Sequence, residues 1–144
     1  MLNKGFTLFE SLLVLFLLAI FTCLGYPSYL SHLQHARRYD GQAALLDLAN
    51  RMEHFYAENH TYETATLATG QTTDIKETSL SNEKWYRLKI MSQTPHGFIL
   101  HAIPRDAQSN DKACQTLSFD QAGVKGISAG PINKPTATVI KCWQ

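Results

Sequence analysis

Glu10 is the residue whose position in this sequence most demands a chemical explanation. After Glu10 no Asp, Glu, Lys or Arg occurs until Arg37. A carboxylate carried to the centre of a bilayer costs about 2.5–3.5 kcal/mol, and less near the interface, so such groups usually have a charged partner. An acid in the first turn of a helix also suits the positive end of the helix dipole. Glu10 is therefore either half of an ion pair or a residue at head-group level in a simple membrane anchor.

The residues before Glu10 suggest where a partner charge could come from. A secretory signal places its small-residue cleavage site after the apolar segment. Here the basic Lys4 and the small Gly5 both come before it. A cut after Gly5 would leave the apolar segment on the mature chain and create a charged amine at Phe6. That amine would lie one helical turn from Glu10, or beside Glu10 of a neighbouring copy.

The segment Gly5-Phe6-Thr7-Leu8-Phe9-Glu10, followed by a long apolar helix, resembles the N-terminus of type IV pilins. The resemblance implies that a prepilin peptidase in the inner membrane cuts between Gly5 and Phe6 and methylates the Phe6 amine. It also implies that Glu10 pairs with the Phe6 amine of an adjacent subunit as a filament grows. One departure is Phe9, where many members of the family carry an aliphatic residue.

Basic residues that could contact a polyanion gather in the second half of the chain. The formal net charge is only +1, which gives no overall attraction to nucleic acid. From residue 86 onward, however, seven bases stand against three acids. Such a region can meet polyanions, although a solvated basic face is the commoner explanation. The candidate DNA contacts are Lys112, Lys125 and Lys134, and the sequence does not show whether they share a face.

We expect DNA binding by this region to be weak or absent at physiological salt. Its charge density is modest, and no aromatic stacking strip is evident between the basic residues, whereas single-stranded nucleic acid binding commonly uses one.

The three cysteines indicate an oxidising compartment. Cys23 lies inside the apolar segment and is expected to pack as a small hydrophobic residue. Cys114 and Cys142 lie in the remaining part and can pair; such a bridge is worth roughly 3–4 kcal/mol in the chain-entropy model. The cysteines and histidines do not have the spacing of a zinc site.

No motif in the sequence indicates an enzyme, a metal or a cofactor. There is no GxSxG, HExxH or glycine-rich phosphate loop. His32 and His35 stand three residues apart, but no nearby acid completes a metal site. Asp120 and Gly123 indicate a turn, because the further acids that a calcium loop requires are missing.

The elements that must position these residues begin with one long helix. Residues 11–30 supply about the 20 apolar residues that a bilayer crossing requires. Pro27 should kink this helix without ending it, because residues 31–59 are again strongly helical. In that second part apolar residues recur at helical spacing: Leu45, Leu48, Ala49, Met52, Phe55 and Tyr56.

The rest of the chain has the pattern of a connecting loop and a small sheet. Residues 60–83 are polar and lack a clear period, which predicts a loop. Strands are predicted at residues 85–91, 98–103 and 115–119, while residues 138–140 could be a fourth strand or only a tied-down segment. The predicted fold class is α+β, a long N-terminal helix packed on a small sheet, which the pilin resemblance implies is antiparallel. The predicted parts are a leader (1–5), a membrane or filament-core helix (6–30) and a soluble head (31–144), divided into 31–59, 60–83 and 84–144.

Several short segments of the head add a second resemblance, to a PilE-type minor pilin. They are Arg37-Arg38-Tyr39-Asp40, Ala102-Ile103-Pro104, Asp111-Lys112-Ala113-Cys114, Phe119-Asp120-Gln121-Ala122-Gly123 and Cys142-Trp143. The resemblance implies an antiparallel sheet on the long helix, with Cys114 and Cys142 bounding a surface loop of variable contacts. Gln115 stands where family members often have glycine, which leaves the local turn open.

The two resemblances together imply a structural pilus subunit. Such a minor pilin spans the inner membrane once with its head in the periplasm, and then enters a cell-surface pilus for adhesion, twitching motility or DNA uptake. Its partners would be other pilin subunits, the prepilin peptidase and the inner membrane before assembly, with no cofactor. The alternatives are a DNA-binding subunit for natural transformation and a type II secretion pseudopilin. The cysteine pair and Trp143 near the end favour a pilus protein over the pseudopilin.

Overall fold

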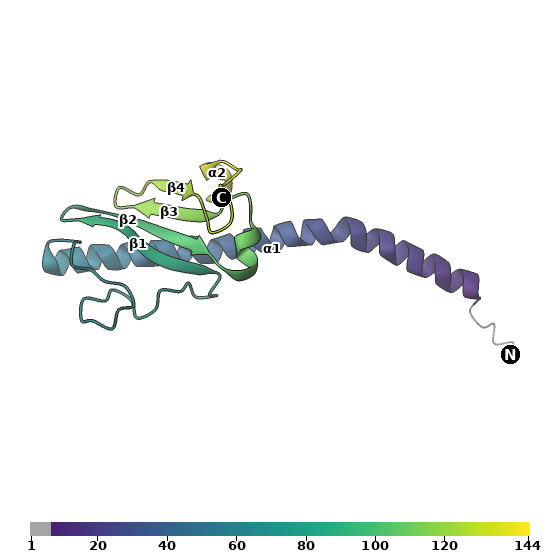
Figure 1. The fold of residues 1–144 in the computed structure, drawn as a ribbon, viewed down its shortest axis with the longest axis horizontal. Helices are drawn as coiled ribbons and strands as arrows, with labels where there is room; N and C mark the ends of the chain where they lie inside the picture. Colours follow the sequence, from purple (N-terminus) through teal and green to yellow (C-terminus); the bar gives the residue numbers. More distant parts are fainter. Residues whose placement is uncertain (1–6) are drawn as a thin grey trace. The chain divides into compact units, whose positions relative to one another are not determined.

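The structure is a computed structural model that describes residues 7–144. The helices are α1 (Leu8–Asn59), the 3-10 helix η1 (Asp106–Asn110) and α2 (Val139–Cys142). The strands are β1 (Tyr86–Thr94), β2 (Gly97–Pro104), β3 (Thr116–Asp120) and β4 (Lys125–Ser128) (Figure 1). The chain divides after His35 into two compact units. The predicted cleavage site at Gly5 and methylation site at Phe6 lie outside the described residues.

The first unit contains the apolar part of α1. Thr7 precedes the helix, and its hydroxyl accepts a hydrogen bond from the Glu10 N–H at 3.3 Å, which caps the first turn. The helix continues through Pro27 and ends at Asn59, as the sequence predicts. Its apolar window has a mean hydropathy of 2.4 and no buried residue, so the helix is long and apolar enough to cross a membrane.

The second unit contains the remaining part of α1, which packs on the sheet (Figure 1). The predicted apolar stripe is confirmed, because its central members are buried, and Phe55 and Tyr56 pack partly buried against them. The buried residues of α1 are Gly41, Ala44, Leu45, Leu48, Ala49 and Met52. The helix ends where His60 adopts a positive φ of 57° and donates its N–H to the Tyr56 carbonyl.

The sheet is antiparallel, with the strand order β1-β2-β3-β4. The three predicted strands are present, and of the two alternatives for residues 138–140 only the fourth strand is wrong. The fourth strand is instead β4, which the tight turn after Asp120 returns directly beside β3. In that turn the Asp120 carboxylate accepts the N–H groups of Ala122 and Val124, and Gly123 has a positive φ of 79°. Residues 138–140 lead into α2.

The loop 60–83 has no strand, as predicted, but side-chain hydrogen bonds hold it in place. Buried Tyr62 donates its hydroxyl hydrogen to the Glu53 carboxylate at 3.0 Å. The Asp74 carboxylate accepts hydrogen bonds from the N–H groups of Thr69 and Gly70. The hydroxyl of Thr66, also a donor to Asp74, is the main cause that lowers the Asp74 pKa to about 2. The Asp74 carboxylate therefore holds residues 66–70 of the loop together by accepting their hydrogen bonds.

Candidate functional site

Glu10 lies in the first turn of α1 among exposed apolar side chains. Leu8 is 81% exposed and Phe9 is 77% exposed. Within residues 7–144 no basic side chain forms an ion pair with Glu10, and the first base after it is Arg37. A positive charge that pairs with Glu10 must therefore come from the residues before Thr7 or from another molecule.

The apolar part of α1 presents large side chains that no other described part of the chain buries. Leu15, Phe21 and Leu24 are between 66% and 74% exposed. Covering one such side chain fully is worth about 1.5–3 kcal/mol. This surface must therefore be covered by lipid or by other protein chains, and Cys23, which is free and exposed, belongs to it.

The C-terminal tail is joined to the segment before β3 by covalent and hydrogen bonds. A disulfide joins Cys114 to Cys142 with a Cα–Cα distance of 5.5 Å, and both residues are fully buried. The N–H and hydroxyl of Thr136 both donate to the Lys112 carbonyl at 3.1 Å. The tail therefore brings the backbone near Lys134 next to the backbone of Lys112, and both lysines are exposed.

Lys125 lies beside the aromatic residue near the end of the chain. Its Nζ atom is 5.3 Å from the centroid of the Trp143 ring, a distance at which a cation–π attraction operates. The Trp143 indole N–H donates to the Gly126 carbonyl at 3.0 Å. The sequence shows no obvious aromatic stacking strip between the basic residues, because Lys125 and Trp143 are distant in the chain. The fold supplies this aromatic–basic pair.

A buried polar network fixes the loop that carries Lys112 to α1. The Arg38 guanidinium donates to both Asp111 oxygens, at 2.7 and 2.9 Å, and this bidentate bond is the main cause of its raised pKa. The Gln108 amide donates to Asp111 and to the hydroxyl of Tyr86. Burial raises the pKa of the Tyr86 hydroxyl, which therefore stays protonated. The network sets the position of the η1–β3 connection.

Gln115 occupies a backbone conformation that favours glycine. Its φ is 48°, in the left-handed region that costs a side-chain-bearing residue about 1–2 kcal/mol. The Gln115 amide donates to the carbonyls of Asp111 at 2.6 Å and Ser109 at 3.2 Å. These bonds offset the backbone cost, which explains how glutamine stands where the resembling family often has glycine.

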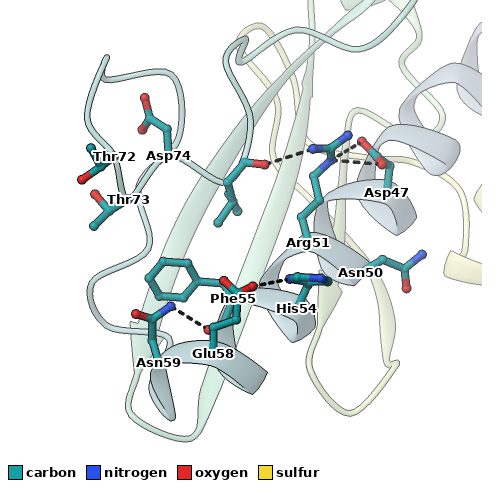
Figure 2. A pocket seen from close by; sticks show the side chains of 11 residues that line it. Asp47, Asn50, Arg51, His54, Phe55, Glu58, Asn59, Thr72, Thr73 and Asp74 are labelled. Atoms are coloured by element: carbon teal, nitrogen blue, oxygen red, sulfur yellow. Dashed lines mark hydrogen bonds and ion pairs between the residues drawn. The ribbon is translucent and has the colours of Figure 1, made fainter.

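A polar groove of about 740 Å³ lies between the end of α1 and residues 72–75 (Figure 2). Its charged groups already have partners. Arg51 donates to Asp47 at 3.1 Å and to the Ile75 carbonyl at 3.2 Å, and His54 lies 3.5 Å from Glu58. The groove holds no nucleophile–base arrangement. Among residues 7–144 no group of three or more metal-ligating side chains is assembled.

Two solved pilin structures are similar to this chain. The non-core minor pilin PilV of Neisseria meningitidis is similar to this chain at 20% identity and a TM-score of 0.53, covering 74% of this chain and 98% of its own. A type IV pilin of Shewanella oneidensis is 30% identical over 64% of this chain and 89% of its own, with a TM-score of 0.45. No curated protein sequence matches the chain.

The similarity to PilV confirms the predicted fold, a long apolar helix with an antiparallel sheet of four strands. The family comparison is more specific. Residues 27–118 match the sequence model of a family described as type IV minor pilin ComP, DNA uptake sequence receptor. That span is more than half of the 144 residues. The chain therefore belongs to the ComP family of type IV minor pilins.

Proposed function

We propose that this minor pilin is a filament subunit that the prepilin peptidase releases from its leader between Gly5 and Phe6 and methylates on the Phe6 amine. As a minor pilin the chain is a structural subunit that assembles with other pilin subunits, anchored first in a membrane and then exposed on a pilus. The observation that carries the finer proposal is the apolar half of α1, with Glu10 at its start and no buried residue in its apolar window. Before assembly this surface is covered by the inner membrane, with the head in the periplasm.

Glu10 is proposed to direct assembly by pairing with the Phe6 amine of a neighbouring subunit. Two unit charges at 4 Å attract by about 1 kcal/mol in water and by about 4 kcal/mol at the effective dielectric of a protein surface. Apolar surroundings such as Leu8 and Phe9 therefore strengthen the attraction. They also make an unpaired carboxylate costly, which favours the paired, assembled state.

Processing and assembly can be tested together in cells with an active peptidase. Intact mass of the membrane-extracted protein should give a chain that begins at methylated Phe6. The same chain should appear in the filament fraction after shearing. A chain that still carries residues 1–5 would contradict the proposal. A Gly5→Trp variant is the matched control, because the bulky side chain should leave the precursor uncut while the head is unchanged.

A second function, capture of DNA during uptake, is favoured by the description of the ComP family as a DNA uptake sequence receptor. Lys112, Lys125 and Lys134 are the lysines that the sequence offers, and Thr136, two residues after Lys134, donates its N–H and hydroxyl to the Lys112 carbonyl. Lys125 adds a cation beside an aromatic ring. The charge density of the sequence predicts weak DNA binding, whereas the family description favours DNA capture. An experiment must decide between these two expectations. The family match also favours a pilus over a type II secretion pseudopilus.

DNA capture can be tested with the full-length protein in neutral detergent micelles. Fluorescence anisotropy with a short labelled duplex at two salt concentrations should show micromolar or tighter binding that weakens steeply with salt. Each phosphate contact contributes about −0.9 to the log–log slope. Absence of binding at the lower salt concentration would remove this second function and leave the filament role standing.

A further inference from the structure

The outer face of the sheet, which points away from the core, carries a row of basic residues. Successive side chains of a strand point to opposite faces. Leu88 of β1 and Leu100 of β2 are buried in the core, at 2% and 0% exposure. The residues next to them therefore point outward, and among these Arg87 and Lys89 are exposed.

The strand register places a histidine within this row. Lys89 is paired directly with His101 of β2, and His101 is paired with Ser118 of β3. Directly opposite Cβ atoms lie about 4.5–5.5 Å apart. Arg87 and Lys89, two residues apart on one strand, are about 7 Å apart along it. These three basic side chains, Arg87, Lys89 and His101, form what we call the outer basic row.

The two strands that carry the row, β1 and β2, contain no acidic residue. The ion pairs among residues 7–144 involve neither Arg87 nor Lys89. The acid that points to this face from β3 is Asp120, opposite Ile99, and its carboxylate already accepts two backbone N–H groups. An anionic ligand on this face would therefore meet cations whose own strands carry no carboxylate.

We propose that the outer basic row contacts the phosphate backbone of DNA, and that protonation of His101 adds a third cation which tightens this contact as the pH falls. This inference rests on the DNA-capture function proposed above and names a surface and a regulation for it. The contact is sequence-independent, because phosphate contacts position a protein on DNA and do not read its bases.

The surroundings of His101 support the sign of this pH effect. Burial, and then the positive charge of Lys89, lower the pKa of His101 below its usual value. The free protein therefore holds His101 neutral at pH 7. The strand register places Lys89 of β1 and the uncharged Ser118 of β3 directly opposite His101, and Arg87 of β1 diagonally across from it. A phosphate between Lys89 and His101 would favour the charged imidazole, so binding takes up a proton and the affinity rises as pH falls.

The outer basic row can be separated from the tail lysines by mutation. Lys125 is paired with Phe119, and the next pair along is Leu117 with Ile127. Leu117 is fully buried, so Lys125 starts from the face of the sheet opposite to Arg87 and Lys89. Lys112 and Lys134 lie outside the strands. A double substitution in either set removes two positive charges, but from different surfaces.

The location is tested with the full-length protein in neutral detergent and a short duplex at pH 7.5. Arg87→Gln with Lys89→Gln should weaken binding at least tenfold and reduce the salt slope by about 1.8, the value for two phosphate contacts. Lys112→Gln with Lys134→Gln, which removes equal charge from the other candidate surface, should weaken binding by a smaller factor. Unchanged binding in the first variant, with binding lost in the second, would overturn the outer basic row and retain DNA capture. No binding by the wild type would overturn both.

The regulation is tested by repeating the titration at pH 5.5. The wild type should bind about threefold tighter or better than at pH 7.5. His101→Gln should lose most of that gain at pH 5.5. His96→Gln, which removes an exposed histidine of the β1–β2 turn, should retain it. A second neutral variant, His101→Asn, guards against a packing defect. Equal pH dependence in the wild type and both His101 variants would overturn the role of His101.

Discussion

The two parts of helix α1 share a backbone conformation but have opposite relations to their surroundings. Residues 8–35 contain no buried side chain, whereas six residues of the part after His35 are buried. Within the first part, almost every side chain of residues 12–27 is apolar. In the second part the apolar side chains occupy one stripe and face the sheet. The comparison shows that the hydrophobic pattern, and not helicity, decides which part requires an external partner.

The largest expected effect is that of substituting Glu10, which lies at the start of the exposed part of α1. Glu10→Gln keeps the size but removes the charge, so incorporation into filaments should fall sharply. Membrane insertion should survive or improve, because a buried amide costs less than a carboxylate. Head stability should not change. Quantifying the protein in sheared filaments and in the membrane fraction checks both. Incorporation at the wild-type level would make Glu10 a simple head-group residue.

The cysteines distinguish the two parts chemically. Alkylation of the native protein should label Cys23 and spare Cys114 and Cys142, which become reactive only after reduction. Reduction should destabilise the head by roughly 3–4 kcal/mol, because the bridge restricts the unfolded chain. Peptide mapping gives the pairing, and denaturation before and after reduction gives the energy. A bridge from Cys23 to either other cysteine would contradict the division of the chain.

Matched leucine substitutions test whether the head depends on one part of α1 alone. Leu48→Ala removes a fully buried side chain and should cost about 2–5 kcal/mol of head stability. Leu15→Ala, at a position 66% exposed, should change it by less than about 0.5 kcal/mol. Denaturant unfolding in micelles can be followed by tryptophan fluorescence, because Trp85 and Trp143 both lie in the head. A large effect of Leu15→Ala would show that the two parts are coupled.

Gly41 lies where the second part of α1 packs closely against Tyr86 of β1. A Cβ at Gly41 would lie 2.9 Å from the ring of Tyr86, which is fully buried. Gly41→Ala gains roughly 0.5–1 kcal/mol of helix preference, but the overpacking costs about 1–3 kcal/mol. We expect net destabilisation in the same unfolding assay. Gly25→Ala is the control, since nothing lies near its would-be Cβ. Stabilisation by Gly41→Ala would contradict this expectation and show that the Tyr86 ring can move away from the added methyl group.

The smallest effect is expected on the solvated side of α1. Arg51→Gln breaks the pair with Asp47, whose side chains are 48% and 45% exposed. An exposed i,i+4 pair contributes only about 0.3–0.5 kcal/mol. The free energy of unfolding should therefore fall by about that amount, and less at high salt. A loss of several kcal/mol would mean that the bond from Arg51 to the Ile75 carbonyl holds the loop.

The sequence alone determined the features that depend on local periodicity and composition. The apolar run and the stripe from Leu45 to Tyr56 gave α1 its correct end and buried face, because helical spacing is a property of neighbouring residues. Three strands were predicted for the same reason. The turn at Asp120 and Gly123 followed from the preferences of those residue types.

Only the tertiary structure decided the features that join distant segments. The fourth strand, with a glycine in its four residues, has a weak local signal and is formed because the turn returns it beside β3. The Arg38–Asp111 bond spans 73 residues, and the outer basic row depends on the register between β1 and β2. Pairing of this kind is set by which packed arrangement buries the apolar faces of all the elements together, and no single segment contains that information.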